Sequence, residues 1–326
     1  MIPLSVLDLV PVREGASVGE ALAESAELAR AAEHFGYKRF WVAEHHGMEG
    51  LAGGATSVVL AHIGHATSTI RIGAGGIMLP NHNPFVIAEQ FGTLDALFPG
   101  RVDLGLGRAP GADRRIFQAL RKDPMASDAF PQDVVELRAR FAGYPPLPVA
   151  ASPGIGADVE MWILGSSLFG AQLAAHLGLP YAFASHFAPA ALDQALEVYR
   201  RTFQPSETLD RPHVMAAMSL IAAESDEEAA ILATSMDQSF VRMRTGGTGK
   251  LSPPIPGFRD TLDPQALAMI DSMREAASAI GGPDTIRERV GRFIERTQAD
   301  ELIFAGSIWD PAARRRSLEI AMEALR

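Results

Sequence analysis

Histidines, carboxylates, an arginine and serines stand directly after short apolar runs at several points of the sequence. Side chains of these types can move protons or bind an anion. They are Asp8, Glu44, His45, His46, Asn81, His82, Arg108, Ser166, Ser167, Ser185 and His186. The chain contains no cysteine, which excludes thiol catalysis, disulfides and cysteine-bound metal centres. Catalysis must therefore come from other residue types.

The tripeptide Glu44-His45-His46 ends one of these apolar runs. Successive side chains of a regular strand point to opposite faces, so at most one of two adjacent residues faces a shared cavity. Two consecutive histidines are therefore a poor chelate, and no other histidine spacing is typical of a metal site, so we expect no metal. A histidine here could donate or accept a proton near neutral pH, or it could simply bond to a loop carbonyl.

Glycines interrupt the third apolar run at Gly73-Ala74-Gly75-Gly76. Glycine weakens a strand, so its presence indicates either that a ligand approaches the backbone closely or that the strand contains a bulge. The pattern alone leaves both interpretations open.

Arg108 lies in a second glycine-rich run, Gly105 to Gly111, whose third glycine falls one position late for a dinucleotide-binding fingerprint. Its guanidinium could clamp an anion or form a surface salt bridge. Ser166 and Ser167 precede a helical pattern from Leu168 to Leu177, where they could cap the helix or leave its N–H groups free for a phosphate.

Eight short apolar runs alternate with helical patterns, an arrangement that requires parallel strands joined by crossover helices. Their near-continuous apolar character is typical of strands covered on both faces. The runs are Ile2 to Leu9, Arg39 to Glu44, Ile70 to Leu79, Val102 to Gly107, Glu160 to Gly165, Tyr181 to His186, Val214 to Ala223 and Glu301 to Gly306. We predict a (β/α)8 TIM barrel, in which the polar residues above gather at the C-terminal ends of the strands.

We expect residues 1–326 to form a single domain with loop insertions. Tyr144 to Asp158 and Thr245 to Asp260 are rich in proline and glycine and are predicted to be long loops. The second could be a mobile lid or an ordinary surface loop. Helix starts are predicted at Ser17, Ser225 and Asp310, and the first helix is expected to end at Gly36.

The net charge of −10 argues against a nucleic-acid-binding protein. The N-terminal segment lacks the basic residues of a signal peptide, and no apolar run reaches the ~18 residues of a membrane span. We therefore expect a cytoplasmic protein that does not bind membranes.

The chain resembles the bacterial luciferase-like flavin-dependent monooxygenases over nearly its whole length, and it looks closest to their uncharacterised, non-luminescent members. Four motifs in order carry the resemblance most specifically, and they are Ala43 to His46, Ile72 to Pro80, Ala88-Glu89-Gln90 through Pro99-Gly100-Arg101, and Gly105 to Arg108. Leu164 to Ser167, Phe183 to His186, Gly282-Pro283 and Ala299 to Leu302 add to it.

The resemblance implies a role for each matching residue. Gly75 and Gly76 match a non-prolyl cis peptide beneath a flavin ring. Arg108 and Ser166, together with Ser167, match residues that hold the FMN phosphate. His45 matches a catalytic histidine beside the reactive edge of the flavin, and Glu44 matches a residue lining the same cavity. Gly107 stands where the light-emitting enzyme has a cysteine, and the segment Gly47 to Gly54 also differs, which weakens the case for light emission and for long-chain aldehydes.

The implied reaction uses reduced FMN, delivered by a separate flavin reductase, and O2 to oxidise a small organic substrate through a flavin peroxide sheltered from water. The resemblance also suggests a homodimer. Two alternatives remain open: hydride transfer with a deazaflavin coenzyme, and flavin binding without catalysis.

Overall fold

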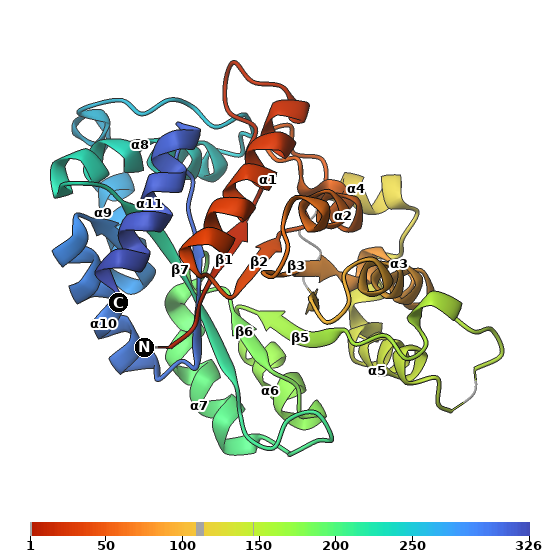
Figure 1. The fold of residues 1–326 in the computed structure, drawn as a ribbon. Coiled ribbons are helices and arrows are strands. Elements are labelled where there is room, and N and C mark those ends of the chain that lie inside the picture. The colour runs from red at the N-terminus through yellow and green to blue at the C-terminus, as the bar shows by residue number, and fades with distance from the viewer. Residues whose placement is uncertain (1, 109–113, 146) are drawn as a thin grey trace.

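The strands of the computed structural model, which describes residues 2–108, 114–145 and 147–326, form one parallel sheet (Figure 1). The strands are β1 (Leu4–Asp8), β2 (Arg39–Val42), β3 (Arg71–Met78), β4 (Val102–Gly107), β5 (Glu160–Gly165), β6 (Tyr181–Phe183), β7 (Val214–Ala222), β8 (Ser278–Gly281) and β9 (Glu301–Ala305). Along the sheet the order runs β6-β5-β4-β3-β2-β1-β9-β7, and β6 also pairs with β7. Eight strands therefore close into a barrel.

Helices surround this barrel (Figure 1). They are α1 (Val18–Phe35), α2 (Thr56–Ala66), α3 (Pro84–Leu97), α4 (Arg114–Leu120), α5 (Phe130–Ala142), α6 (Leu168–Leu177), α7 (Leu192–Thr202), α8 (Asp226–Arg244), α9 (Pro264–Ala277), α10 (Pro283–Thr297) and α11 (Pro311–Ala324). The predicted (β/α)8 barrel is confirmed, and each of the eight predicted runs contains one of the barrel strands.

The predicted helix starts are also confirmed. Ser17 and Glu20 form a reciprocal capping box, and α1 ends at Gly36, whose φ of 94° is left-handed. Ser225 accepts a hydrogen bond from the Glu228 amide at the start of α8. Asp310 caps α11 in the same way.

Strand β8 was not predicted. It pairs with the second half of β7, from Ser219 to Ala222, while the first half of β7 pairs with β9. Since β7 is longer than the barrel wall requires, its end is free to take a further partner.

The barrel interior is filled by side chains that alternate with those facing the helices. Trp41 and Trp162 pack edge to face inside, with ring centroids 5.4 Å apart. Phe40 and Val42, on either side of Trp41, point outward and pack under the helices. The interior is therefore a packed core, as expected of this architecture.

A buried ionic cluster closes the barrel at the N-terminal ends of its strands. Arg39 lies 2.9 Å from Asp103, 3.1 Å from Glu160 and 3.0 Å from Glu301. Arg71 also pairs with Asp103. These five side chains come from the first or second position of β2, β3, β4, β5 and β9, and so tie the strands together at the end opposite to the expected site.

The peptide bond between Gly75 and Gly76 is cis, as the resemblance predicted. The pairing of β3 with β4 shifts register between Gly75 and Ile77, so the segment is a bulge as well. A Cβ atom on Gly75 would lie 2.7 Å from Leu7, and one on Gly76 would lie 2.7 Å from the Gly105 carbonyl oxygen. Neither position has room for a side chain.

Both predicted long loops consist mainly of irregular backbone with short 3-10 turns. Gly111, which belongs to the second glycine-rich run, lies outside the described residues. Within the described ranges, no helix combines the length and the apolar character needed to cross a bilayer.

Candidate functional site

His45 stands just beyond the C-terminal end of β2, partly exposed at the mouth of the barrel. Burial lowers the pKa of its imidazole, the Glu44 charge opposes this, and the His46 charge adds to it. The buried Nδ1 atom has no hydrogen-bond partner among the described residues. A buried polar atom left without a partner is uncommon and points to a group that binds there.

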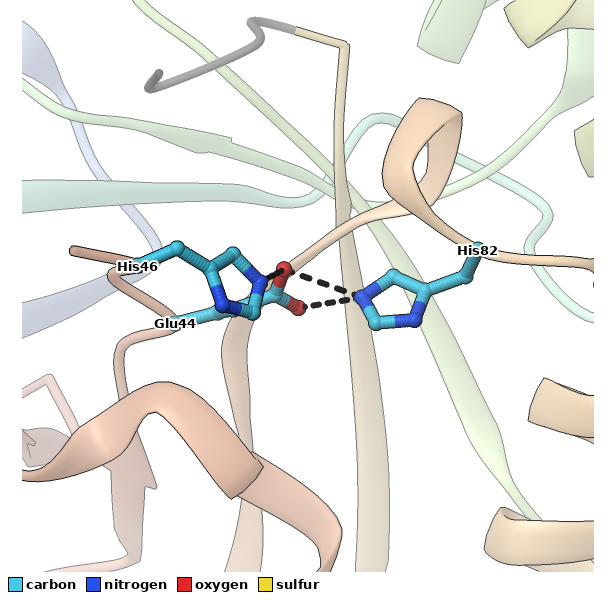
Figure 2. Close-up of side chains that lie close together, drawn as sticks. All are labelled: Glu44, His46 and His82. Carbon is cyan, nitrogen blue, oxygen red and sulfur yellow. Dashed lines mark hydrogen bonds and ion pairs between the residues drawn. The ribbon is translucent and has the colours of Figure 1, made fainter. Parts of the chain in front are cut away.

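Glu44 has a different environment from its neighbour. Its side chain is 1% exposed, and its carboxylate lies between the imidazole rings of His46 and His82 (Figure 2). His46 Nε2 lies 2.7 Å from Oε1, and His82 Nε2 lies 2.9 Å from both oxygens. The Met78 amide donates to Oε2 at 3.2 Å. Glu44 therefore joins the segments that follow β2 and β3.

The electrostatics of this cluster keep Glu44 charged. Burial alone would raise the pKa of its carboxyl group, but the hydrogen bonds and charges of His82 and His46 outweigh that effect and lower the pKa.

Glu44, His46 and His82 also offer donor atoms of the kind that bind zinc, all within 4.8 Å of one another. The adjacent residue His45 is not part of this group, which combines His46 with the distant His82. In this geometry the Glu44 carboxylate accepts hydrogen bonds from both imidazole rings, so its negative charge is already stabilised without an ion.

His186 follows β6 and lies near His45, whose charge affects it. Burial, and secondarily that charge, lowers the pKa of His186 to about 4, so the ring is neutral at physiological pH. Its Nδ1 atom has no hydrogen-bond partner among the residues described here. The sequence placed His186 at the mouth without a role, because its neighbours come from distant parts of the chain.

Arg108, at the end of β4, reaches toward the start of α6. Its guanidinium lies over the ring of Phe169, 4.2 Å from the ring centroid. Its Nε donates to the Ser127 carbonyl oxygen at 3.3 Å, and Asp128 lies 3.6 Å from Nη2. With 40% of its side chain exposed, Arg108 remains accessible to a ligand.

Ser167 occupies the N-cap position of α6, but its side chain makes no capping hydrogen bond. The first N–H groups of the helix therefore lack a partner from this hydroxyl, and the helix dipole favours an anion there. Ser166 precedes it and is partly exposed. Arg108 and the Ser166-Ser167 pair thus converge on one end of α6, where their donors fit a phosphate group.

Two residues expected at the mouth do not face it. Asp8 is fully buried, and its carboxylate accepts hydrogen bonds from Ser25 at 2.6 Å and Arg314 at 2.7 Å, on α1 and α11. Ser185 is fully buried and donates to the Ala217 carbonyl oxygen. Both connect elements of the barrel, so the prediction that they contribute to the mouth was wrong.

A cavity of about 270 Å³ adjoins His186 at the C-terminal ends of β1, β7 and β9. Helices α8 and α9 and the loop segment Gly247 to Leu251 form its outer walls. The loop predicted from Thr245 to Asp260 therefore contributes one wall of a cavity, and a lid motion remains a prediction.

Comparison with known proteins gives consistent matches. The family model of luciferase-like monooxygenases matches residues 2–301. A luciferase-like monooxygenase of Escherichia coli (strain K12) is 48% identical over 99% of this chain and 96% of its own length. The N-acetyl-S-alkylcysteine monooxygenase of Bacillus subtilis (strain 168) is 35% identical over 76% of this chain and 75% of its own length.

Solved structures share the fold. The crystal structure of apo-MsnO8 has a TM-score of 0.90 at 35% identity and covers 99% of this chain and 98% of its own. The oxygenating constituent of 3,6-diketocamphane monooxygenase from Pseudomonas putida, in complex with FMN, has a TM-score of 0.74 at 17% identity, with coverages of 99% and 97%. An F420-dependent secondary alcohol dehydrogenase has a TM-score of 0.72 at 16% identity, with coverages of 100% and 99%. These last two show likeness of fold alone.

Proposed function

Because the chain belongs to the luciferase-like monooxygenase family, we propose that it is a flavin-dependent monooxygenase that uses reduced FMN and O2 to oxidise a small organic substrate. Bound reduced FMN would supply the two electrons needed to activate O2. One oxygen atom enters the substrate, and the other leaves as water with two protons. A separate reductase supplies the reduced flavin, and the active species is a homodimer.

The observation that carries this proposal is the juxtaposition of His45 with a phosphate-type site at the same end of the barrel. Arg108 and the N-terminus of α6 would hold the FMN phosphate, with Ser166 and Ser167 as further donors. Gly75 and Gly76, joined by a cis peptide bond, would form the backbone surface beneath the flavin ring. Asp128 would turn away from Arg108 when an anion binds.

His45 is the residue that handles protons in this proposal. Its lowered pKa keeps the ring largely neutral near pH 7, so that it can accept a proton or donate one through its N–H. Glu44 is enclosed by its own partners, and we assign it a positioning role in the same site. It fixes the turn that presents His45.

The experiment is an anaerobic titration followed by exposure to isotopically labelled oxygen gas. The purified protein is titrated separately with reduced FMN and with a reduced deazaflavin coenzyme. We then add labelled oxygen with aldehydes, ketones or cell extract and analyse the products by mass spectrometry. Tight binding of reduced FMN and labelled product support the proposal. Binding of the deazaflavin alone would instead indicate hydride transfer, and FMN binding without labelled product would indicate a non-catalytic flavin protein.

A further inference from the structure

The exposed surface of the cavity beside His186 is mainly apolar. Helices α8 and α9 lie together on one side of the barrel (Figure 1) and form one wall of the cavity. The apolar residues include Leu9, Met48, Phe187, Met236, Phe240 and Met273. Methionine side chains are flexible and polarisable, so they adapt to apolar ligands of different shapes. At about 270 Å³ the cavity has the volume of roughly nine water molecules, enough for a compact small molecule.

Every charged side chain that lines this cavity has an opposite charge beside it. Arg274 contacts both carboxylate oxygens of Asp237, at 2.7 and 2.6 Å, and Asp237 is buried. Arg259 lies 3.9 Å from the same carboxylate and also pairs with Asp271. The charges around this wall are therefore balanced.

Arg242 is engaged in the same way. It donates to the Lys250 carbonyl oxygen at 2.7 Å and to the Ser252 hydroxyl at 2.6 Å, and Glu14 lies 3.9 Å away. Arg274 Nε has no partner among the described residues, but that atom is itself buried. Each of these arginines already has a carboxylate beside it, so a carboxylate ligand would lose its hydration and would have to compete with Asp237 or Glu14 for a partner.

His186 links the cavity to the proposed reaction. It lines the cavity and lies near His45, and its lowered pKa makes this end of the cavity uncharged as well. A molecule seated against His186 would lie close to the histidine that handles protons.

Resting on the proposed function, we infer that this cavity is the substrate pocket and that it takes neutral, largely apolar small molecules in preference to carboxylates. The apolar part of the ligand contacts the methionines, and the atom to be oxidised lies toward His186.

A matched pair of ligands tests this inference without any turnover. Methyl (benzylthio)acetate is neutral, and (benzylthio)acetate is the same molecule with a free carboxylate. We titrate each into the purified protein at neutral pH and measure the heat of binding. The ester is expected to bind at least about tenfold more tightly than the acid, since the acid must lose its hydration and compete with Asp237 and Glu14 for the arginines. Equal or tighter binding of the acid, or binding of neither, would overturn the inference.

Methionine substitutions locate the site. Met273→Trp fills the cavity and is expected to weaken ester binding at least about tenfold. Met125→Trp is the control, because it makes the same change at an exposed methionine that does not line the cavity. Met48→Trp, on the opposite wall, should act like Met273→Trp and covers the case in which that variant does not fold. Unchanged binding in both folded cavity variants would place the ligand elsewhere.

The binding assay also separates this inference from the proposed function. It needs neither flavin nor oxygen. If Met273→Trp blocks ester binding but no oxygen is ever incorporated, the pocket inference holds and the monooxygenase proposal is wrong. If oxygen is incorporated into acids alone, the monooxygenase proposal holds and the pocket inference is wrong.

Discussion

His45 and Glu44 are adjacent in the sequence, yet their surroundings give them separate tasks. His45 keeps a buried ring nitrogen without a partner, whereas the Glu44 carboxylate is fully engaged by His46, His82 and the Met78 amide. An unsatisfied group can act on a ligand, and a satisfied one holds structure. The adjacent acid and imidazole therefore should respond differently to substitution.

Replacing His45 should impair turnover more than folding. We expect His45→Gln to lower the rate of substrate oxidation by about 10²-fold or more, the usual size of a general acid–base contribution, with little change in FMN affinity. Single-turnover kinetics with reduced FMN and oxygen measure this. His62→Gln, an exposed histidine on α2, is the control and should be neutral. An unchanged oxidation rate in His45→Gln would remove its proton-handling role.

Replacing Glu44 should impair folding stability first. In Glu44→Gln one acceptor oxygen becomes an NH2 group that faces donors from His46 and His82. We expect the free energy of unfolding to fall by about 1–3 kcal/mol, the cost of buried polar groups left unsatisfied. Urea unfolding monitored by circular dichroism checks this. A stable variant that had nevertheless lost all activity would show that Glu44 acts on the reaction directly.

Removing metal ions should not affect this cluster. Its carboxylate already accepts hydrogen bonds from both imidazoles, so the group does not require an ion to compensate its charge. We expect the same melting temperature before and after dialysis against EDTA. A lower melting temperature that zinc restores, and that is absent in His82→Ala, would show that the three residues hold a structural metal.

Among the helices and strands, the sequence predicted each barrel strand that is marked by a run of apolar residues. It did not predict β8, which forms only because it pairs with another strand. The eight runs of the barrel and the caps at Ser17, Ser225 and Asp310 are local patterns. Strand β8 is only Ser-Ala-Ile-Gly, and it exists because the second half of β7 extends beyond β9. The contact of Glu44 with His82 likewise requires β2 and β3 to lie side by side. No local pattern contains that information.

The start of α6 gives a prediction at this scale. Arg108→Ala removes the guanidinium that lies over Phe169 and faces the uncapped helix end. Because a hydrogen bond to a charged group contributes about 1.5–3 kcal/mol, FMN affinity should fall by about 10- to 100-fold. Riboflavin has the same ring without the phosphate, so its affinity should change little. Fluorescence titration with both ligands measures the difference, and an equal loss for both would place Arg108 beside the ring instead.

In the whole molecule, the candidate site and the ionic cluster lie at opposite ends of the barrel. The candidate site and the cavity lie at the C-terminal ends of the strands, where side chains remain accessible or unsatisfied. The N-terminal end is closed by Arg39, Arg71, Asp103, Glu160 and Glu301, which are paired with one another. This division matches the rule for the architecture, in which loops beyond the strand ends carry function and the opposite face carries stability.

The contribution of the ionic cluster to folding stability can be tested by measuring how the effect of replacing Glu301 depends on pH. Burial alone would raise the pKa of its carboxyl group, but the hydrogen bond with His213, the charges of Arg39 and Lys38 and the bond from Ser5 lower the pKa to about 2. A carboxylate with a depressed pKa in the folded state stabilises the protein above its unfolded pKa of about 4.5, and this contribution is lost as the pH falls toward 2.

We therefore expect Glu301→Gln to destabilise the protein by about 3–5 kcal/mol at pH 7, because it leaves part of the Arg39 charge buried without a partner. The difference from the unsubstituted protein should shrink as the pH is lowered below 4.5, since the carboxyl group of the unfolded chain then takes up a proton that the folded protein does not bind until about pH 2. Urea unfolding at pH 7, 5, 4 and 3 measures the difference at each pH. Glu288→Gln, in an exposed pair with Arg292, is the control and should shift stability by no more than about 0.5 kcal/mol. A loss of stability in Glu301→Gln that stayed constant down to pH 3 would mean that the side chain contributes by packing rather than by its charge.

Oxygen incorporation by the folded fraction of Glu301→Gln should remain normal, because the cluster lies at the opposite end of the barrel from His45.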